Sequence, residues 1–112
     1  MRKPKMLIIR GLLPVLVLYI LTKEGKMHGY MIKKKIEEIT KKELPQGMIY
    51  TLLRRMENDG LIVVINGKSD RNRKVYDISL EGREYLKRHV IVLKKIVFII
   101  NTVINFVESA SS

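Results

Sequence analysis

Apolar residues at helical spacing mark the most informative segment of the chain. Ile49, Leu52, Leu53 and Met56 fall at positions i, i+3, i+4 and i+7, which predicts a helix with one buried stripe. The positions on the opposite side of this helix are polar or small, namely Gly47, Thr51, Arg54 and Asn58. A short helix with a packed back and a polar front of this kind can enter the major groove of DNA.

The residues that follow this helix predict a β-hairpin. Gly60 suits the position just past a helix end, because glycine tolerates a positive φ. A β-branched run at residues 61–65 has strand length, and the polar loop of residues 66–73 opens on an Asn-Gly turn. A returning strand with one buried face is expected from the alternation of Tyr76, Ile78 and Leu80. This order of elements predicts a winged helix-turn-helix, a mostly α fold with a small β-hairpin wing.

Two further helices are expected ahead of the helix just described. The first, at residues 12–23, is apolar nearly all round and is expected to be buried, with Pro14 tolerated in its first turn. The second runs from residue 28 or 29 to residue 41, with one face formed by Ile32, Ile36 and Ile39. Residues 44–46 are expected to turn into the next helix, since Pro45 suits a helix N-terminus.

The charge balance favours a polyanionic partner. The chain of 112 residues has 22 basic and 11 acidic side chains, a net charge of +11. In the lysine run of residues 33–35, Lys33 or Lys34 is a candidate phosphate contact, although such runs usually form a solvated face.

The residue types argue against catalysis. The absence of cysteine excludes disulfides and thiolate metal sites and fits a reducing cytoplasm. His28 and His89 lie in different elements, and no cluster of His, Asp and Glu has the spacing of a metal or catalytic site. We therefore expect no enzyme activity, no cofactor and no metal.

Three groups of residues between positions 28 and 82 form a recognisable pattern. They are His28-Gly29-Tyr30, then Pro45, Ile49-Tyr50, Leu53, Met56-Glu57 and Gly60-Leu61-Ile62, and finally Arg73-Lys74, Tyr76, Ile78-Ser79 and Gly82. Together they closely resemble the PadR family of winged-helix transcriptional regulators over residues 12–86, with Met56 where leucine is expected. The resemblance implies the short form of the family, which dimerises through a C-terminal helix. It also implies that the chain is similar to repressors released by small ligands near the dimer interface.

The last segment predicts a long helix with a wide apolar seam. Ser79 is a suitable N-cap, and a helix from there to about residue 107 would be roughly 40 Å long. Three adjacent rows recur every seven residues: Leu86, Leu93, Ile100 and Val107; His89, Ile96 and Val103; and Val90, Val97 and Ile104. Since so wide a stripe must be buried, we expect a second copy of the chain to cover it. A membrane-bound helix is the rival interpretation, but the uncharged stretch of residues 96–107 is too short to span a bilayer.

These expectations combine into one functional hypothesis. Residues 1–79 would form the DNA-binding domain, and residues 80–112 a dimerisation helix with a short polar tail. The protein would be a cytoplasmic, homodimeric, sequence-specific transcriptional regulator. It would act as a repressor that reads a roughly palindromic operator with helix 45–59 and the 66–74 wing. The candidate DNA contacts are Gln46, Tyr50, Thr51, Arg54, Arg55, Lys68, Arg71, Arg73 and Lys74.

Within that set the roles differ. Thr51 and Arg54 are the expected base readers, whereas Tyr50 and Arg55 are the expected phosphate contacts. The wing cations are expected to hold the DNA backbone or the minor groove.

Three alternatives remain open. A non-specific, nucleoid-type architectural protein would use the same fold and charge to bind any duplex. A winged-helix adaptor would bind an acidic protein surface instead of DNA. A small apolar effector at the dimer interface is also conceivable, although the chain has no tryptophan and the last helix offers mainly aliphatic side chains plus Phe98 and Phe106.

Overall fold

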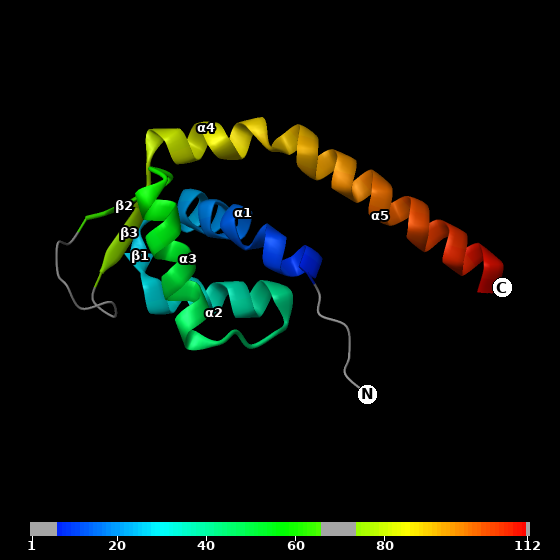
Figure 1. The fold of residues 1–112 in the computed structure, drawn as a ribbon, viewed down its shortest axis with the longest axis horizontal. Coiled ribbons are helices and arrows are strands. Elements are labelled where there is room, and N and C mark those ends of the chain that lie inside the picture. The colour runs from blue at the N-terminus through cyan, green and yellow to red at the C-terminus, as the bar shows by residue number, and fades with distance from the viewer. Residues whose placement is uncertain (1–6, 66–73, 112) are drawn as a thin grey trace.

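The helices pack around a small antiparallel sheet, and one helix projects away from them (Figure 1). The computed structural model describes residues 7–65 and 74–111. Its elements are α1 (Leu7–Glu24), β1 (Met27–His28), α2 (Gly29–Thr40), α3 (Gln46–Asn58), β2 (Ile62–Val64), β3 (Val75–Ile78), α4 (Leu80–Arg88) and α5 (Val90–Ser111). This arrangement confirms the predicted winged helix-turn-helix with a long C-terminal helical segment.

One apolar core joins α1, α2, α3 and the sheet. The stripe predicted for α3 is confirmed, because Ile49 and Leu53 are fully buried, Met56 is nearly so and Leu52 is half-buried. From the other elements the core receives Leu13, Val17, Leu18, Ile20, Leu21, Ile32, Ile36, Leu44, Ile62, Tyr76 and Ile78. The predicted periodicities therefore account for the core residues of α2, α3 and β3 other than Tyr50, and the predicted all-round apolar helix accounts for those of α1.

The sheet has the order β1-β3-β2, with both neighbours antiparallel to β3. Tyr76 pairs with Met27 on one side and with Val64 on the other, and its side chain points into the core. The sequence did not predict β1, since a strand of two residues is too short to show alternation. His28, expected at or just before the first residue of the second helix, pairs with Val75 in this strand and makes no side-chain cap bond to α2.

Two helix predictions need correction. Pro14 lies inside α1 instead of in its first turn, because the helix begins at Leu7. A proline there removes one backbone hydrogen bond, and the helix persists because its apolar side chains are packed into the core. Ile39 was expected on the buried face of α2, but it is 46% exposed because it lies in the last turn, beyond the covered part of the helix.

The returning strand ends earlier than its alternation predicts. Leu80 is the first residue of α4, not part of β3, and it is 75% exposed. The strand stops because Ser79 caps the helix, as predicted, with its hydroxyl accepting a hydrogen bond from the Gly82 amide at 2.9 Å. The Ser79 hydroxyl also donates to the carbonyl of Gly60, the residue whose positive φ ends the α3 segment.

The single C-terminal helix predicted from the heptads is divided at His89. This residue has a φ of −87° and a ψ of −1°, and its amide donates to the carbonyls of both Tyr85 and Leu86. The imidazole stacks on the Tyr85 ring with 3.9 Å between centroids, and Nδ1 lies 2.8 Å from the Tyr85 carbonyl oxygen. The axis therefore changes direction between α4 and α5 (Figure 1).

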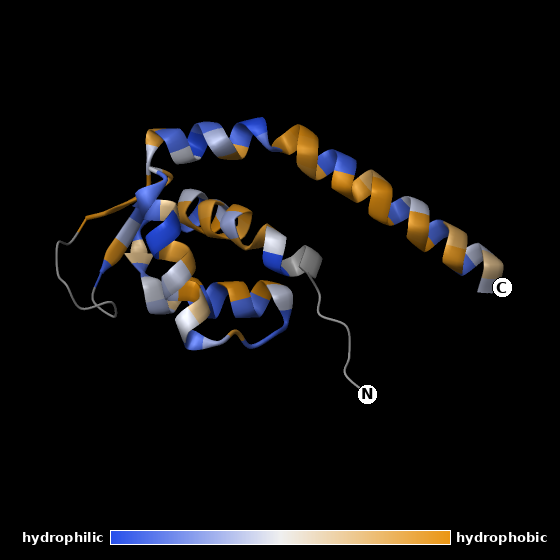
Figure 2. Cartoon of the chain, in the orientation of Figure 1, coloured by the Kyte–Doolittle hydropathy of each residue, from blue (hydrophilic) through white to orange (hydrophobic). Residues whose placement is uncertain are grey.

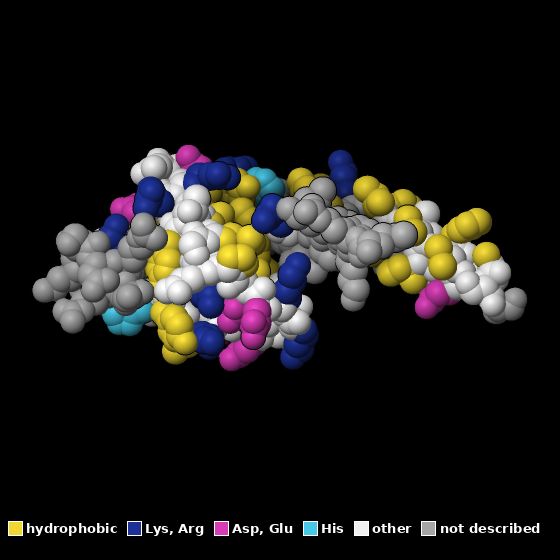
Figure 3. All heavy atoms as spheres, turned by 60° about the horizontal axis from the view of Figure 1, so that its bottom comes forward, with side chains coloured by type: hydrophobic (Ala, Val, Ile, Leu, Met, Phe, Trp, Pro, Cys, Tyr) yellow, Lys and Arg dark blue, Asp and Glu magenta, His cyan; other side chains and the backbone are white. Residues whose placement is uncertain are grey.

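Beyond this break, α5 is an apolar arm that the other described residues leave mostly exposed. None of its residues is buried, and hydrophobic positions recur along its length (Figure 2). Within the part of the chain that the structure describes, Leu80–Ser111 is the one helical segment long and apolar enough to cross a membrane, judged by length and composition. This differs from the expectation drawn from the uncharged residues 96–107 alone, because Lys94 and Lys95 do not end the apolar segment. The globular part differs, since its surface carries many lysines and arginines (Figure 3).

Gly82 is the position where α4 approaches the sheet most closely. A Cβ atom there would lie 2.1 Å from the Leu61 carbonyl oxygen and 2.8 Å from Cγ1 of Ile78. We expect Gly82→Ala to lower the free energy of unfolding by about 2–3 kcal/mol, because the backbone of α4 must move away from Leu61. The measurement is urea unfolding followed by circular dichroism.

Gly47→Ala is the matched control for Gly82→Ala. A Cβ atom at Gly47 would meet nothing within 4 Å, so the same substitution in α3 should leave stability unchanged or raise it by about 0.5–1 kcal/mol. Equal stability of the two variants would contradict the close packing assigned to Gly82.

Candidate nucleic-acid interface

The outer face of α3 is polar and open to solvent. Gln46, Thr51, Arg54 and Arg55 are all exposed, while the opposite face is packed against the core. Among the described residues, neither Arg54 nor Arg55 forms an ion pair, so both guanidinium groups are available to an external anion. Guanidinium groups bind phosphate oxygens or the acceptor edge of guanine with two parallel hydrogen bonds.

Tyr50 does not belong to this outer face. Only 5% of it is exposed, and its ring lies over Gly29, where an added Cβ would come within 3.0 Å of the Tyr50 Cε1 atom. The sequence analysis expected Tyr50 to contact phosphate, but the start of α2 covers this side chain. We therefore correct this expectation, treat Tyr50 as a core residue and leave it out of the proposed DNA contacts.

β2 and β3 form the two strands of the hairpin whose connecting loop was predicted to be the wing. The wing residues Lys68, Arg71 and Arg73, proposed from the sequence, lie outside the described residues. Lys74 is described and precedes β3 directly, in a half-buried position. The two strands thus bring the two ends of the basic loop together at one end of the hairpin.

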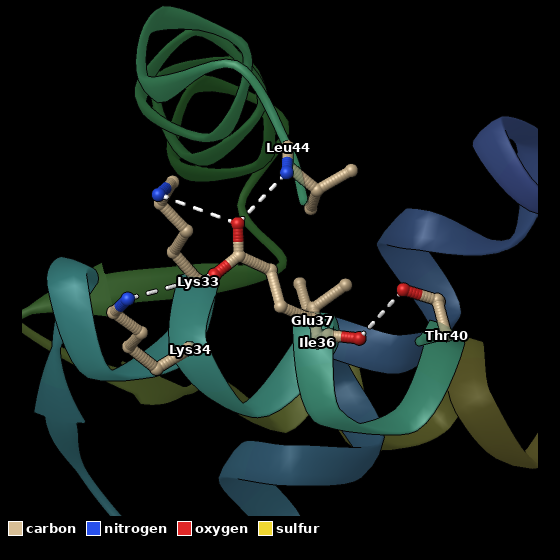
Figure 4. Close-up of polar contacts among 6 residues, drawn as sticks. All are labelled: Lys33, Lys34, Ile36, Glu37, Thr40 and Leu44. Atoms are coloured by element: carbon tan, nitrogen blue, oxygen red, sulfur yellow. Dashed lines mark hydrogen bonds and ion pairs between the residues drawn. The ribbon is translucent and has the colours of Figure 1, made fainter. Parts of the chain in front are cut away.

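A carboxylate that the sequence analysis did not identify fixes the turn into α3. One oxygen of Glu37 accepts a hydrogen bond from the Leu44 amide at 2.7 Å and lies 3.4 Å from the Lys33 ammonium (Figure 4). The side chains of Glu37 and Lys33 are each only 14% exposed, and Leu44 itself is buried in the core. Glu37 therefore links the end of α2 to the residue that precedes Pro45 and α3.

The ion pairs of α2 change the interpretation of the lysine run at residues 33–35. Lys33 is paired with Glu37, and the Lys34 ammonium lies 3.9 Å from the second Glu37 oxygen (Figure 4). Lys35 forms an ion pair with Glu24 at 2.7 Å, which joins α2 to the end of α1, and this contact raises the pKa of Lys35. The run is therefore engaged in intramolecular pairs, and Lys34, 48% exposed, is the more accessible of the two candidate phosphate contacts.

The fold and the open polar face of α3 define a winged-helix protein of the class that regulates transcription. The transcriptional regulator PadR-like family matches residues 17–88, so the chain belongs to the PadR-like family of transcriptional regulators. The match runs from the middle of α1 to the end of α4 and includes α3. No curated protein sequence matches the chain.

Solved structures of related regulators are similar over almost the whole chain. A transcriptional regulator from Thermoplasma acidophilum is 31% identical, with a TM-score of 0.75 and coverage of 88% of this chain and 95% of that one. A regulator from Clostridium thermocellum is 27% identical, with a TM-score of 0.75 and coverage of 89% and 97%. A PadR-like regulator from Bacillus cereus is 26% identical, with a TM-score of 0.71 and coverage of 88% and 96%.

Glu37→Gln tests the role of the carboxylate in the turn. The Leu44 amide, and then Lys33, lower the pKa of Glu37 below its ordinary value of 4.5. The carboxylate thus adds stability above pH 4.5, and this contribution is lost as the pH falls through the lowered pKa of the folded state. Glu37→Gln should therefore lower the melting temperature at neutral pH, and the difference from the unsubstituted protein should shrink in acid.

Thermal unfolding by circular dichroism at a series of pH values measures this effect. Glu38→Gln is the control, because it removes the same charge from the adjacent, exposed position. A loss of stability that is equal in the two variants at neutral pH would refute the role of Glu37.

Proposed function

We propose that this protein is a homodimeric, sequence-specific DNA-binding repressor that reads a roughly palindromic operator. In this proposal α3 enters the major groove and the wing of residues 66–74 holds the flanking backbone or minor groove. The proposed contacts are Gln46, Thr51, Arg54, Arg55, Lys68, Arg71, Arg73 and Lys74. Membership of a family of transcription regulators supports a non-enzymatic role and a cytoplasmic location.

The orientation of α3 is the observation that carries the proposal. Its buried residues, Ile49, Leu53 and Met56, hold the helix so that Thr51 and Arg54 project outward. Thr51 offers a hydroxyl and a methyl group, and Arg54 offers a planar fork of donors, which are the groups that discriminate base edges. We assign base reading to these two residues and phosphate binding to Arg55.

The division of the chain supports a dimer. The elements up to β3 form the DNA-binding unit, and the segment of residues 80–112 supplies the dimerisation surface. Along α5 the apolar side chains are exposed, for example Val97 (56%), Phe98 (72%) and Phe106 (73%). A helix with so much exposed apolar surface needs a partner, and a second copy of α5 provides a self-complementary one.

A groove beside α5 extends this surface. It has a volume of about 380 Å³ and is lined by Gly11 and Leu12 of α1 and by Ile96, Ile99 and Ile100 of α5. We propose that a helix of the second copy packs into it. A small apolar effector, the other occupant considered from the sequence, would then compete with that helix for the groove. With a second copy packed there, the proposed seam would also include Ile99, which lies outside the three heptad rows.

A non-specific architectural protein is the alternative. It would owe its affinity almost entirely to counterion release from phosphates and would bind all duplexes alike. The polar, non-basic side chains beside Arg54 on the outer face of α3 favour sequence reading.

Binding to the DNA upstream of the protein's own gene, compared with a shuffled duplex across a salt series, decides between these functions. A preference of about 10³ or more at physiological salt is expected for a site-specific regulator. Equal affinity for the upstream and the shuffled duplex, lost in parallel as the salt concentration rises, would favour the architectural function. Sites selected from random sequence should then also bind no more tightly than the shuffled duplex.

Arg54→Ala tests base reading by the outer face of α3. The substitution should cost about 1–3 kcal/mol of binding free energy at the selected site and relax the preference at one base pair. Arg83→Ala on α4, which also removes an exposed arginine, should leave that preference intact. If Arg54→Ala weakens all sequences equally, Arg54 is a phosphate contact and its assignment is wrong.

Val97→Glu tests the dimer. Val97 is largely exposed in the single chain, so the substitution should leave the fold of each protomer unchanged but bury an unpaired carboxylate in the dimer. The dimer should weaken by about 3 kcal/mol or more, about a 100-fold change in its dissociation constant by sedimentation equilibrium. Asn101→Glu is the control, because it adds the same negative charge to the row of polar residues at seven-residue spacing formed by Lys94, Asn101 and Glu108. Equal dissociation in both variants would place the dimer interface elsewhere.

A further inference from the structure

A hollow between α1 and α3 has a lining unlike the rest of the surface. Its volume is about 620 Å³, within the range of about 300–1,000 Å³ that is usual for small-molecule sites. From α1 it is lined by Arg10, Gly11, Leu13 and Pro14, and from α3 by Gly47, Met48, Thr51, Leu52 and Arg55. It lies on the flank of α3 that faces α1, next to the proposed reading face.

The lining combines hydrocarbon walls with two cations. Leu13, Pro14, Met48 and Leu52 supply the walls, and no acidic side chain takes part. Arg10 and Arg55 approach from different helices and are exposed, and neither forms an ion pair among the described residues. Two unpaired guanidinium groups beside an apolar wall complement a molecule that has both an anionic and an apolar part.

Two glycines, Gly11 and Gly47, border open space in the hollow. A Cβ atom added at Gly11 or at Gly47 would meet nothing within 4 Å, so each position borders free space in the hollow. The backbone of each helix is therefore accessible from the hollow, and a flat or elongated apolar group can lie between α1 and α3.

We propose that this hollow binds a small amphipathic anion, an apolar body that carries one carboxylate, sulfonate or phosphate group. The apolar body packs against Met48, Leu52 and Pro14, and the anionic group lies between Arg10 and Arg55. A bare anion would gain nothing from the walls, and a neutral apolar molecule would gain nothing from the cations.

The position of the hollow assigns the ligand a regulatory effect, and this step rests on the proposed function. Thr51 and Arg55 line the hollow and are also proposed DNA contacts. A ligand held there occupies the flank of α3 that must approach the DNA, so ligand and DNA compete directly. This competition needs no change in the dimer or in the angle between helices.

Nuclear magnetic resonance of the full chain tests the site with a defined pair of probes. The anionic probe is 1-anilinonaphthalene-8-sulfonate, and the neutral probe is N-phenyl-1-naphthylamine, which has the same aromatic body without the sulfonate. The backbone amide signals of Gly11 and Gly47 are the reporters, with Gly25 and Gly60 as distant controls. Because Gly11 also borders the groove beside α5, Gly47 is the decisive reporter.

The sulfonate probe should shift the Gly47 signal in a saturable manner. The affinity of the neutral probe should be lower by a factor of about five or more. Arg55→Gln and Arg10→Gln should each weaken the sulfonate probe about fivefold. Arg54→Gln should leave the affinity for the sulfonate probe unchanged, because Arg54 is exposed and adjacent to Arg55 on α3 but does not line the hollow. An unchanged Gly47 signal, or equal probe affinities in the Arg54 and Arg55 variants, overturns the site.

The final step separates this inference from the proposed function. A DNA duplex added in excess should displace the sulfonate probe from the hollow, as followed by the Gly47 signal. If the protein binds no duplex while the arginine-dependent probe binding persists, the proposed function fails and the site stands. If the duplex binds but leaves the probe in place, competition is wrong and the regulatory part of the inference is overturned.

Discussion

Burial of the inner face of α3 is the constraint on which the rest of the structure depends. Ile49, Leu53 and Met56 are enclosed by α1, α2 and the sheet, and each such side chain contributes about 1.5–3 kcal/mol when it is removed from water. Rotating the helix would expose all three side chains. The direction in which the outer face of α3 points is therefore fixed. The hydrogen bond from the Leu44 amide to Glu37 fixes where α3 begins.

The sequence was sufficient to predict features that depend on a repeated local pattern. The period of α3, the Ser79 cap and the glycine stop at Gly60 each reflect a local rule, and the structure shows all three. The position of Tyr50 depends instead on what covers the flank of α3, which is the start of α2 and lies far away in sequence. The Glu37–Leu44 bond joins residues seven positions apart across a turn, a spacing with no sequence signature.

The charge and the apolar surface of the protein are separated along its length. Lysines and arginines are spread over the globular part among other side chains, and α5 carries most of the exposed large hydrophobic side chains (Figure 3). The family match ends with α4 at residue 88, just before this arm begins. The globular part is held by its core, whereas the arm has no buried residue of its own.

The break at His89 makes α5 a lever. Because 22 residues of helix extend for about 33 Å, a change of about 5° at this joint moves the far end of the arm by about 3 Å. The stacked pair of Tyr85 and His89 occupies the pivot, where a small local adjustment is amplified most. In the proposed dimer, held together by its arms, the distance between the two α3 helices would therefore depend on the geometry at this joint.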